Sequence, residues 1–236
     1  MRRTHFFELK NITAAVLIAI TAATGGSAMA QVAPSASEAA AYTGLHAAAY
    51  KGDVAKIEKL AASKADVNAR DSNGRTPLQV ASFAKQRDAI RALVKAGADI
   101  NLLDKDRYDG VTIAAVADDE ETLRVLLAAG ASAKLITSRY DGTALIAAAH
   151  LGHDGVVKQL IAAGAPLDHV NNLHWTAAIE AVVLGNGGVR HQETLRALIK
   201  AGANLQLTDR QGNTPLQLAT SRGYAEMVKM LSVPAR

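Results

Sequence analysis

The chain of 236 residues contains no cysteine, so it can form no disulfide and cannot carry the acylated cysteine of a lipoprotein. Aromatic residues are also scarce, at 4% of the chain with a single tryptophan, although 49% of the residues are apolar. Much of this apolar content is alanine, which favours thin, closely packed helical layers over a bulky core. The absence of cysteine suits a compartment that oxidises stray thiols.

Several signatures of catalysis are missing as well. The sequence has no G-x-S-x-G, no H-E-x-x-H and no cysteine nucleophile. The glycine-rich stretch 185–188 lacks the Lys-Ser/Thr of a phosphate-binding loop. His150 and His153 are three residues apart and could share a metal, but we do not favour that interpretation. The acidic run 118–121 is interpreted as the favourable start of a helix. We therefore expect no enzyme activity, no cofactor and no metal.

The charge distribution argues against a nucleic-acid partner. The formal net charge is +4, and no run of lysine and arginine is present. Residues 1–30 hold three basic residues and one acidic residue, so the remainder of the chain keeps a net charge of only about +2. Binding to nucleic acid requires a clustered basic surface, which this sequence does not predict.

Residues 1–30 have the three-part layout of a secretory signal peptide. A basic start with Arg2, Arg3 and Lys10 precedes an apolar run from residue 12 to 23, and Ala28-Met29-Ala30 forms an A-x-A cleavage site. The apolar run is too short to span a bilayer comfortably. We expect cleavage before Gln31, no membrane span afterwards, and a periplasmic or secreted protein. The pattern favours the general secretory route, and the paired arginines leave twin-arginine export open.

A pattern of about thirty residues then runs six times through the chain. Its clearest copies are Gly74–Ala81 and Gly212–Ala219, and weaker copies start at Thr43, Thr112, Thr143 and Thr176. An Ala-Gly-Ala sequence recurs at 96–98, 129–131, 163–165 and 201–203. Periods of 20–50 residues are typical of a stacked array, whose long surface suits binding.

Each copy predicts two helices. A threonine before Pro77 or Pro215 has the chemistry of a helix N-cap followed by proline in the first turn. The second helix has apolar residues at positions i, i+3 and i+4, and the glycine of Ala-Gly-Ala ends it. The triplets are Ile90/Leu93/Val94, Leu123/Leu126/Leu127, Val157/Leu160/Ile161 and Leu195/Leu198/Ile199. Neither helix is stable alone, so stability must come from stacking.

The pattern G-x-T-P-L-x-x-A, with a later G-A-x-[VIL]-N, resembles the ankyrin repeat. Gly97–Asn101 matches the ending, and Leu151-Gly152-His153 resembles the Gly-His turn of that family. The resemblance covers about residues 41–232. It implies an all-α, ankyrin-like solenoid of six helix-turn-helix units with hairpin loops. We place the units at 41–70, 71–103, 104–137, 138–170, 171–207 and 208–236, after a linker at 31–40.

Unit lengths are expected to vary. The threonines at 43, 76, 112, 143, 176 and 214 are spaced by 33, 36, 31, 33 and 38 residues. This spacing predicts extra length in the third unit near residues 103–107 and in the fifth unit near residues 184–192. In solenoids such insertions fall in loops on one face.

The resemblance implies a protein partner, held on the concave face of the solenoid by the hairpin tips and first helices, and a monomeric protein. Arg107-Tyr108-Asp109-Gly110 and Arg139-Tyr140-Asp141-Gly142 are expected at the same place in neighbouring units, followed by His174-Trp175 in the next. Tyrosine, tryptophan and arginine are enriched at binding hot spots. The partner-binding set is therefore Arg107, Tyr108, Arg139, Tyr140, His174 and Trp175. An open alternative is that the tyrosines pack between the tips and each Asp-Gly only makes a turn.

Three functions remain in competition at this point. The first is an exported adaptor or scaffold. The second is an enzyme, or an accessory subunit or modulator of a periplasmic enzyme, with a site formed by Asp109, Asp141 and His174. The third is a passive, stress-protective structural protein. We favour the first, because a solenoid has no closed pocket to exclude water from a reaction.

Overall fold

The structure is a computed structural model, and it describes residues 31–232. These residues form thirteen α-helices and no β-strand, apart from one isolated antiparallel bridge between Thr137 and Gly142. After α2 (Ala36–Ala41) come six helix pairs: α3 (Gly44–Lys51) with α4 (Val54–Ala62), α5 (Pro77–Phe83) with α6 (Arg87–Lys95), α7 (Gly110–Val116) with α8 (Glu120–Ala128), α9 (Ala144–Leu151) with α10 (Asp154–Ala162), α11 (Ala177–Val183) with α12 (Val189–Lys200), and α13 (Pro215–Ser221) with α14 (Ala225–Leu231). The predicted all-α array is confirmed.

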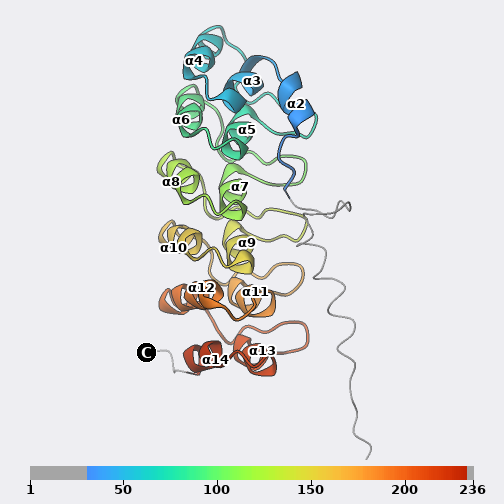
Figure 1. Cartoon of the computed structure of the whole chain (residues 1–236), viewed down its shortest axis with the longest axis vertical. Coiled ribbons are helices and arrows are strands. Elements are labelled where there is room, and N and C mark those ends of the chain that lie inside the picture. The colour runs from blue at the N-terminus through green and yellow to red at the C-terminus, as the bar shows by residue number, and fades with distance from the viewer. Residues whose placement is uncertain (1–30, 233–236) are drawn as a thin grey trace, which may run out of the picture. The chain divides into compact units, whose positions relative to one another are not determined.

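The six pairs stack in chain order. The first helices (α3, α5, α7, α9, α11 and α13) form one column and the second helices (α4, α6, α8, α10, α12 and α14) form a parallel one, as Figure 1 shows. Each helix contacts its partner and the equivalent helix of the next pair. The hairpin loops between pairs project from the side of the first helices.

Apolar residues fill the space between the two columns. The first two members of each second-helix triplet, such as Leu123 and Leu126, are completely buried. The third members, such as Leu127, are partly buried and pack against the same core. Small residues such as Ala148 and Ala149 are fully buried where the first helix α9 lies between its neighbours. The predicted helix stripes are therefore confirmed.

The N-caps correct the predicted unit lengths. Asp109, and not Thr112, caps α7, because its side chain accepts the hydrogen bond from the Thr112 backbone N–H. The N-caps of the first helices are Thr43, Thr76, Asp109, Thr143, Thr176 and Thr214, with spacings of 33, 33, 34, 33 and 38 residues. The expectation of extra length in the third unit was wrong. The fifth unit is longer, and its second helix α12 has 12 residues.

The segment 31–40, expected to be a linker, instead contains most of helix α2. Ser35 and Glu38 form a reciprocal capping box at its start, and alanine is the best helix former. The Glu38 carboxylate also accepts hydrogen bonds from Asn73 Nδ2 and Arg75 Nη2, both at 2.6 Å. Tyr42, at the end of α2, donates to Asp71 at 2.7 Å. Helix α2 is thus part of the folded unit that spans Ala33–Arg236.

The predicted signal peptide at 1–30 lies outside the described residues. Within residues 31–232, no helix is both long and apolar enough to cross a bilayer.

Candidate functional site

The candidate site is the series of hairpin tips that precede the first helices. We call residues 71–75, 104–108, 138–142, 171–175 and 209–213 the hairpin row. Four tips begin with an aspartate or asparagine whose Oδ1 accepts two backbone N–H groups of its own turn, at 2.8–3.0 Å; these residues are Asp71, Asp104, Asn171 and Asp209. In the remaining tip, Ser138 Oγ accepts from the Tyr140 N–H. Each tip is therefore closed by its own side chain.

Hydrogen bonds also join successive tips. The backbone N–H of Lys105 donates to the Asn73 carbonyl at 3.1 Å, Ser138 to Arg107 at 3.0 Å, and Asn172 to Tyr140 at 2.9 Å. Side chains add bonds from Lys105 to the Ser72 carbonyl, from Asn172 to the Arg139 carbonyl and from Arg210 to the Asn172 carbonyl. The hairpin row is thus a connected surface.

The two Arg-Tyr-Asp-Gly sequences were expected at the same place in neighbouring units, and this expectation was wrong. Arg107 lies two residues before the N-cap Asp109, whereas Arg139 lies four residues before the N-cap Thr143. The position of Arg107 corresponds to that of Asp141, and Arg107 Nη1 forms an ion pair with Asp141 Oδ1 at 2.7 Å. Counted from the N-caps, the second copy therefore lies two residues earlier in its unit than the first copy does.

Counting back from the N-caps also shows which aromatic residues occupy equivalent places. Tyr108 and Trp175 each lie one residue before an N-cap, at the place of the completely buried Arg75. Tyr140 corresponds instead to Leu173, three residues before an N-cap. The structure thus pairs Tyr108 with Trp175, and Tyr140 with a leucine that sequence reasoning had not selected.

The six predicted residues differ in exposure. Arg107, Arg139 and His174 are exposed, whereas Tyr108, Tyr140 and Trp175 are half-buried. Trp175 packs against the core. Burial raises the pKa of Tyr108, as do the neighbouring Asp106 and Asp104, while the nearby Arg139 guanidinium lowers it.

Arg139 differs from the other basic side chains at the apex of the hairpin row. Lys105 and Arg210, at the equivalent place, each donate to a carbonyl of the preceding tip. The Arg139 side chain forms no hydrogen bond or ion pair with the residues that the structure describes. Its charge is therefore available to an external group.

Sequence reasoning also missed exposed apolar side chains on the same hairpins. Ile136, Val170 and Leu173 are 46%, 40% and 36% exposed, and they are half of the large apolar residues that are exposed in the described part. All three lie in the loops that carry the fourth and fifth N-caps. An apolar residue among the polar residues of these loops was the available signal.

The residues of the hypothetical catalytic site are not assembled for chemistry. Asp109 is 1% exposed, and its Oδ1 caps α7. Burial raises the pKa of Asp109, and its buried Oδ2 has no hydrogen-bond partner. Asp141 is paired with Arg107. The interior position of Asp109 keeps it from a bound substrate.

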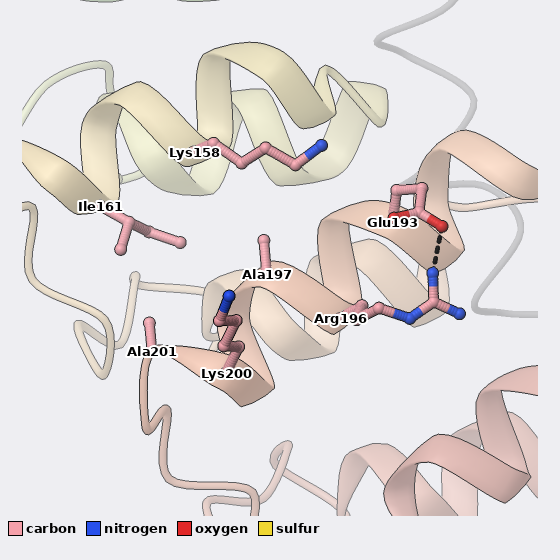
Figure 2. Close-up of a pocket in the computed structure, with 7 residues that line it drawn as sticks. All are labelled: Lys158, Ile161, Glu193, Arg196, Ala197, Lys200 and Ala201. Atoms are coloured by element: carbon pink, nitrogen blue, oxygen red, sulfur yellow. Dashed lines mark hydrogen bonds and ion pairs between the residues drawn. The ribbon is translucent and has the colours of Figure 1, made fainter.

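Two hollows lie on the other side of the stack, between second helices. One, of about 490 Å³, is lined by residues of α10 and α12, and Figure 2 shows Lys158, Glu193 and Lys200 around it, with Glu193 paired to Arg196. A similar hollow of about 520 Å³ lies between α6 and α8. Within the described ranges, no three histidine, aspartate or glutamate side chains are grouped so that they could hold a metal.

The comparisons with known proteins agree with this architecture. A family model described as ankyrin repeats in three copies matches residues 19–104 and 111–209, and one described as ankyrin repeats in many copies matches residues 190–231. The ankyrin repeat protein YahD of Escherichia coli K12 is 38% identical over 95 residues, which are 40% of this chain and 47% of YahD. The match thus spans about half the length of that relative.

Two solved structures show the same arrangement. An ankyrin repeat domain from Acinetobacter baumannii AYE is 45% identical, with a TM-score of 0.75 over 79% of this chain and 95% of that domain. A chain in the complex of the predatory endopeptidase Bd0816 of Bdellovibrio bacteriovorus with the immunity protein Bd3460 is 27% identical. Its TM-score is 0.63, over 81% of this chain and 97% of that chain.

Proposed function

Because the chain belongs to the ankyrin repeat family, whose repeats generally mediate protein–protein interaction, we propose that it is an exported adaptor that binds a partner protein through the hairpin row and the neighbouring first helices, on the concave face of the solenoid. The observation that carries this proposal is the network of hydrogen bonds within and between the tips. In this network Asn172 donates to the carbonyls of Arg139 and Tyr140, and Leu173 directly follows Asn172.

A connected surface lowers the cost of binding. Ordering side chains and loops on association costs free energy, and a surface that is already ordered avoids part of that cost. Tyrosine and arginine contribute large contact area and directional hydrogen bonds, which is why they recur at hot spots. The half-buried Tyr140 and the exposed Arg139, which has no partner in the described part of the chain, combine these properties.

The relatives support a binding role over catalysis. A chain with a similar fold is found in the complex of an endopeptidase with its immunity protein, which is an assembly of two proteins. Ankyrin repeats are typically interaction modules rather than enzymes. We infer that this chain is not an enzyme and acts as a monomer without cofactors or nucleic acid. An accessory subunit or modulator of an enzyme would use the same surface.

We also propose export to the periplasm or the exterior. The support is the signal-like pattern of residues 1–30 and the absence of cysteine. Sequencing the N-terminus of the protein from periplasmic extract should give Gln31 as the first residue. Membrane-bound protein that still begins at Met1 would contradict the proposal.

Photo-cross-linking in living cells tests the binding role. A photo-reactive amino acid in place of Tyr140 should capture a protein, whereas one in place of Arg91, which is exposed on the outer helix α6, should not. The two positions control for expression and for nonspecific capture. Cross-links from Arg91 alone, or none from Tyr140, would place the interaction elsewhere. A passive structural protein would give no discrete product from either position.

A further inference from the structure

We propose that the partner presents an acidic segment, with a carboxylate that binds Arg139 and an adjacent apolar side chain that packs on Tyr140 and Leu173. This inference rests on the proposed function and specifies the chemistry of the partner at that surface. It concerns the fourth and fifth hairpins, residues 138–142 and 171–175.

The first argument is the unsatisfied charge. Arg139 is exposed and has no partner among the described residues, whereas the neighbouring Arg107 is neutralised by Asp141 at 2.7 Å. A guanidinium presents donors in a planar fork that matches a carboxylate. An acid from outside the chain is the group that completes this site.

The second argument is the apolar surface beside that charge. The backbone bond from Asn172 to Tyr140 aligns the two tips, and it places Leu173 at the position next to Tyr140. Leu173 is 36% exposed, and Ile136 and Val170 on the same two hairpin loops are exposed as well. A concentration of exposed apolar side chains on a polar surface is typical of an interaction site.

The third argument comes from the chain itself. Helix α2 already places one carboxylate, that of Glu38, against the hairpin row, on the hairpin side of the stack (Figure 1). Glu38 of this alanine-rich helix accepts from Arg75 Nη2 and Asn73 Nδ2, both at 2.6 Å. The arginine of the tip at 71–75 thus has a carboxylate partner from elsewhere in the molecule, whereas Arg139, at a different place in its tip, has none among the described residues.

The third hairpin sets the boundary of the site. Asp106 is exposed at its apex, at the place that Tyr140 and Leu173 occupy in the next two tips. A carboxylate would be repelled there. The acidic group is therefore directed to Arg139 and the apolar group toward the fifth hairpin, which fixes the orientation of the partner segment.

Selection from random twelve-residue peptides displayed on phage tests this chemistry against the purified chain. The enriched peptides should share aspartate or glutamate within two residues of leucine, phenylalanine or tryptophan. For one such peptide, labelled with a fluorophore, Arg139→Glu should weaken binding at least about tenfold, as expected for the loss of a hydrogen-bonded charge pair. Replacing the acidic residue of the peptide by lysine should restore binding to this variant.

Matched controls separate the surface from general charge effects. Arg91→Glu, on the exposed face of α6, should leave the affinity unchanged, and Leu173→Ala should weaken it with an unchanged circular dichroism spectrum. Higher salt should weaken binding to the parent chain. Enriched peptides without acidic residues, no enrichment at all, or equal binding by Arg139→Glu would overturn the inference. If cross-links from Tyr140 are nevertheless found, the adaptor role stands and only the partner chemistry fails.

Discussion

The stability of the array should depend on single leucines of the second helices, and Leu160 in α10 is the sharpest test. Leu160 is 0% exposed and lies within the continuous core, and α10 contacts both α8 and α12. Leu160→Ala removes three carbon atoms from this core. Burial of each carbon contributes about 0.8 kcal/mol, so the transfer contribution alone is roughly 2.4 kcal/mol.

The cavity left behind adds to this loss. Flanking helices on both sides restrict collapse of the cavity. We therefore expect Leu160→Ala to lower the free energy of unfolding by about 3–5 kcal/mol in total, as seen for buried leucines. For a chain of this size, each kcal/mol lowers the melting temperature by about 2–4 °C, which gives a drop of roughly 10 °C. Because units depend on their neighbours, the loss should reach the whole middle of the array.

Urea unfolding followed by circular dichroism measures this change, and Leu151→Ala is the matched control. Leu151 ends the first helix of the same unit and is 36% exposed, so its truncation should cost well under half as much. Hydrogen exchange should show that α8 and α12 lose protection together with α10 in Leu160→Ala. Equal effects of the two substitutions, or a loss of protection confined to α10, would refute the layered core described above.

Three further changes test local features. Asp109→Asn should stabilise the protein by about 1 kcal/mol at pH 8 and much less near pH 4, because it keeps the Oδ1 cap of α7 and removes a buried negative charge. Burial raises the folded-state pKa of Asp109, so the stability that this carboxyl contributes is present below its unfolded pKa and is lost as pH rises through the folded pKa. If the free energies of unfolding of the parent chain and of Asp109→Asn change in parallel with pH, this argument is contradicted. Arg75→Met should cost about 3–5 kcal/mol in urea unfolding, since it removes the guanidinium that pairs with the largely buried Asp71 at 2.7 Å. A cost below about 1 kcal/mol would argue against a buried ion pair. Glu38→Gln should accelerate amide exchange in α2 while exchange in α10 stays constant, and unchanged exchange in α2 would show that the bonds to Arg75 and Asn73 do not hold this helix.

The architecture was accessible from the sequence because its determinants are local. A proline after Thr76 or Thr214, and apolar residues three and four apart, each specify a helix or its start within one turn of chain. A repeated local pattern can only bury its apolar stripes by stacking, so the period predicts the array. The partner-binding residues were predicted from a repeated motif and from residue types at the expected hairpin tips, which specifies no contacts between them, and their role in binding stays a prediction.

The register of the hairpin row was decided by tertiary structure. Thr112 matched the sequence pattern, yet Asp109 caps the helix, and this difference moves Arg107 opposite Asp141 and leaves Arg139 without a partner among residues 31–232. The docking of α2 was equally hidden, because Glu38 bonds to Arg75, which lies 37 residues away in the chain. Local patterns determine which residues form helices, whereas the pairing of charges across units depends on which loops the stack brings together. That pairing, rather than the presence of arginine and tyrosine, distinguishes Arg139 within the hairpin row.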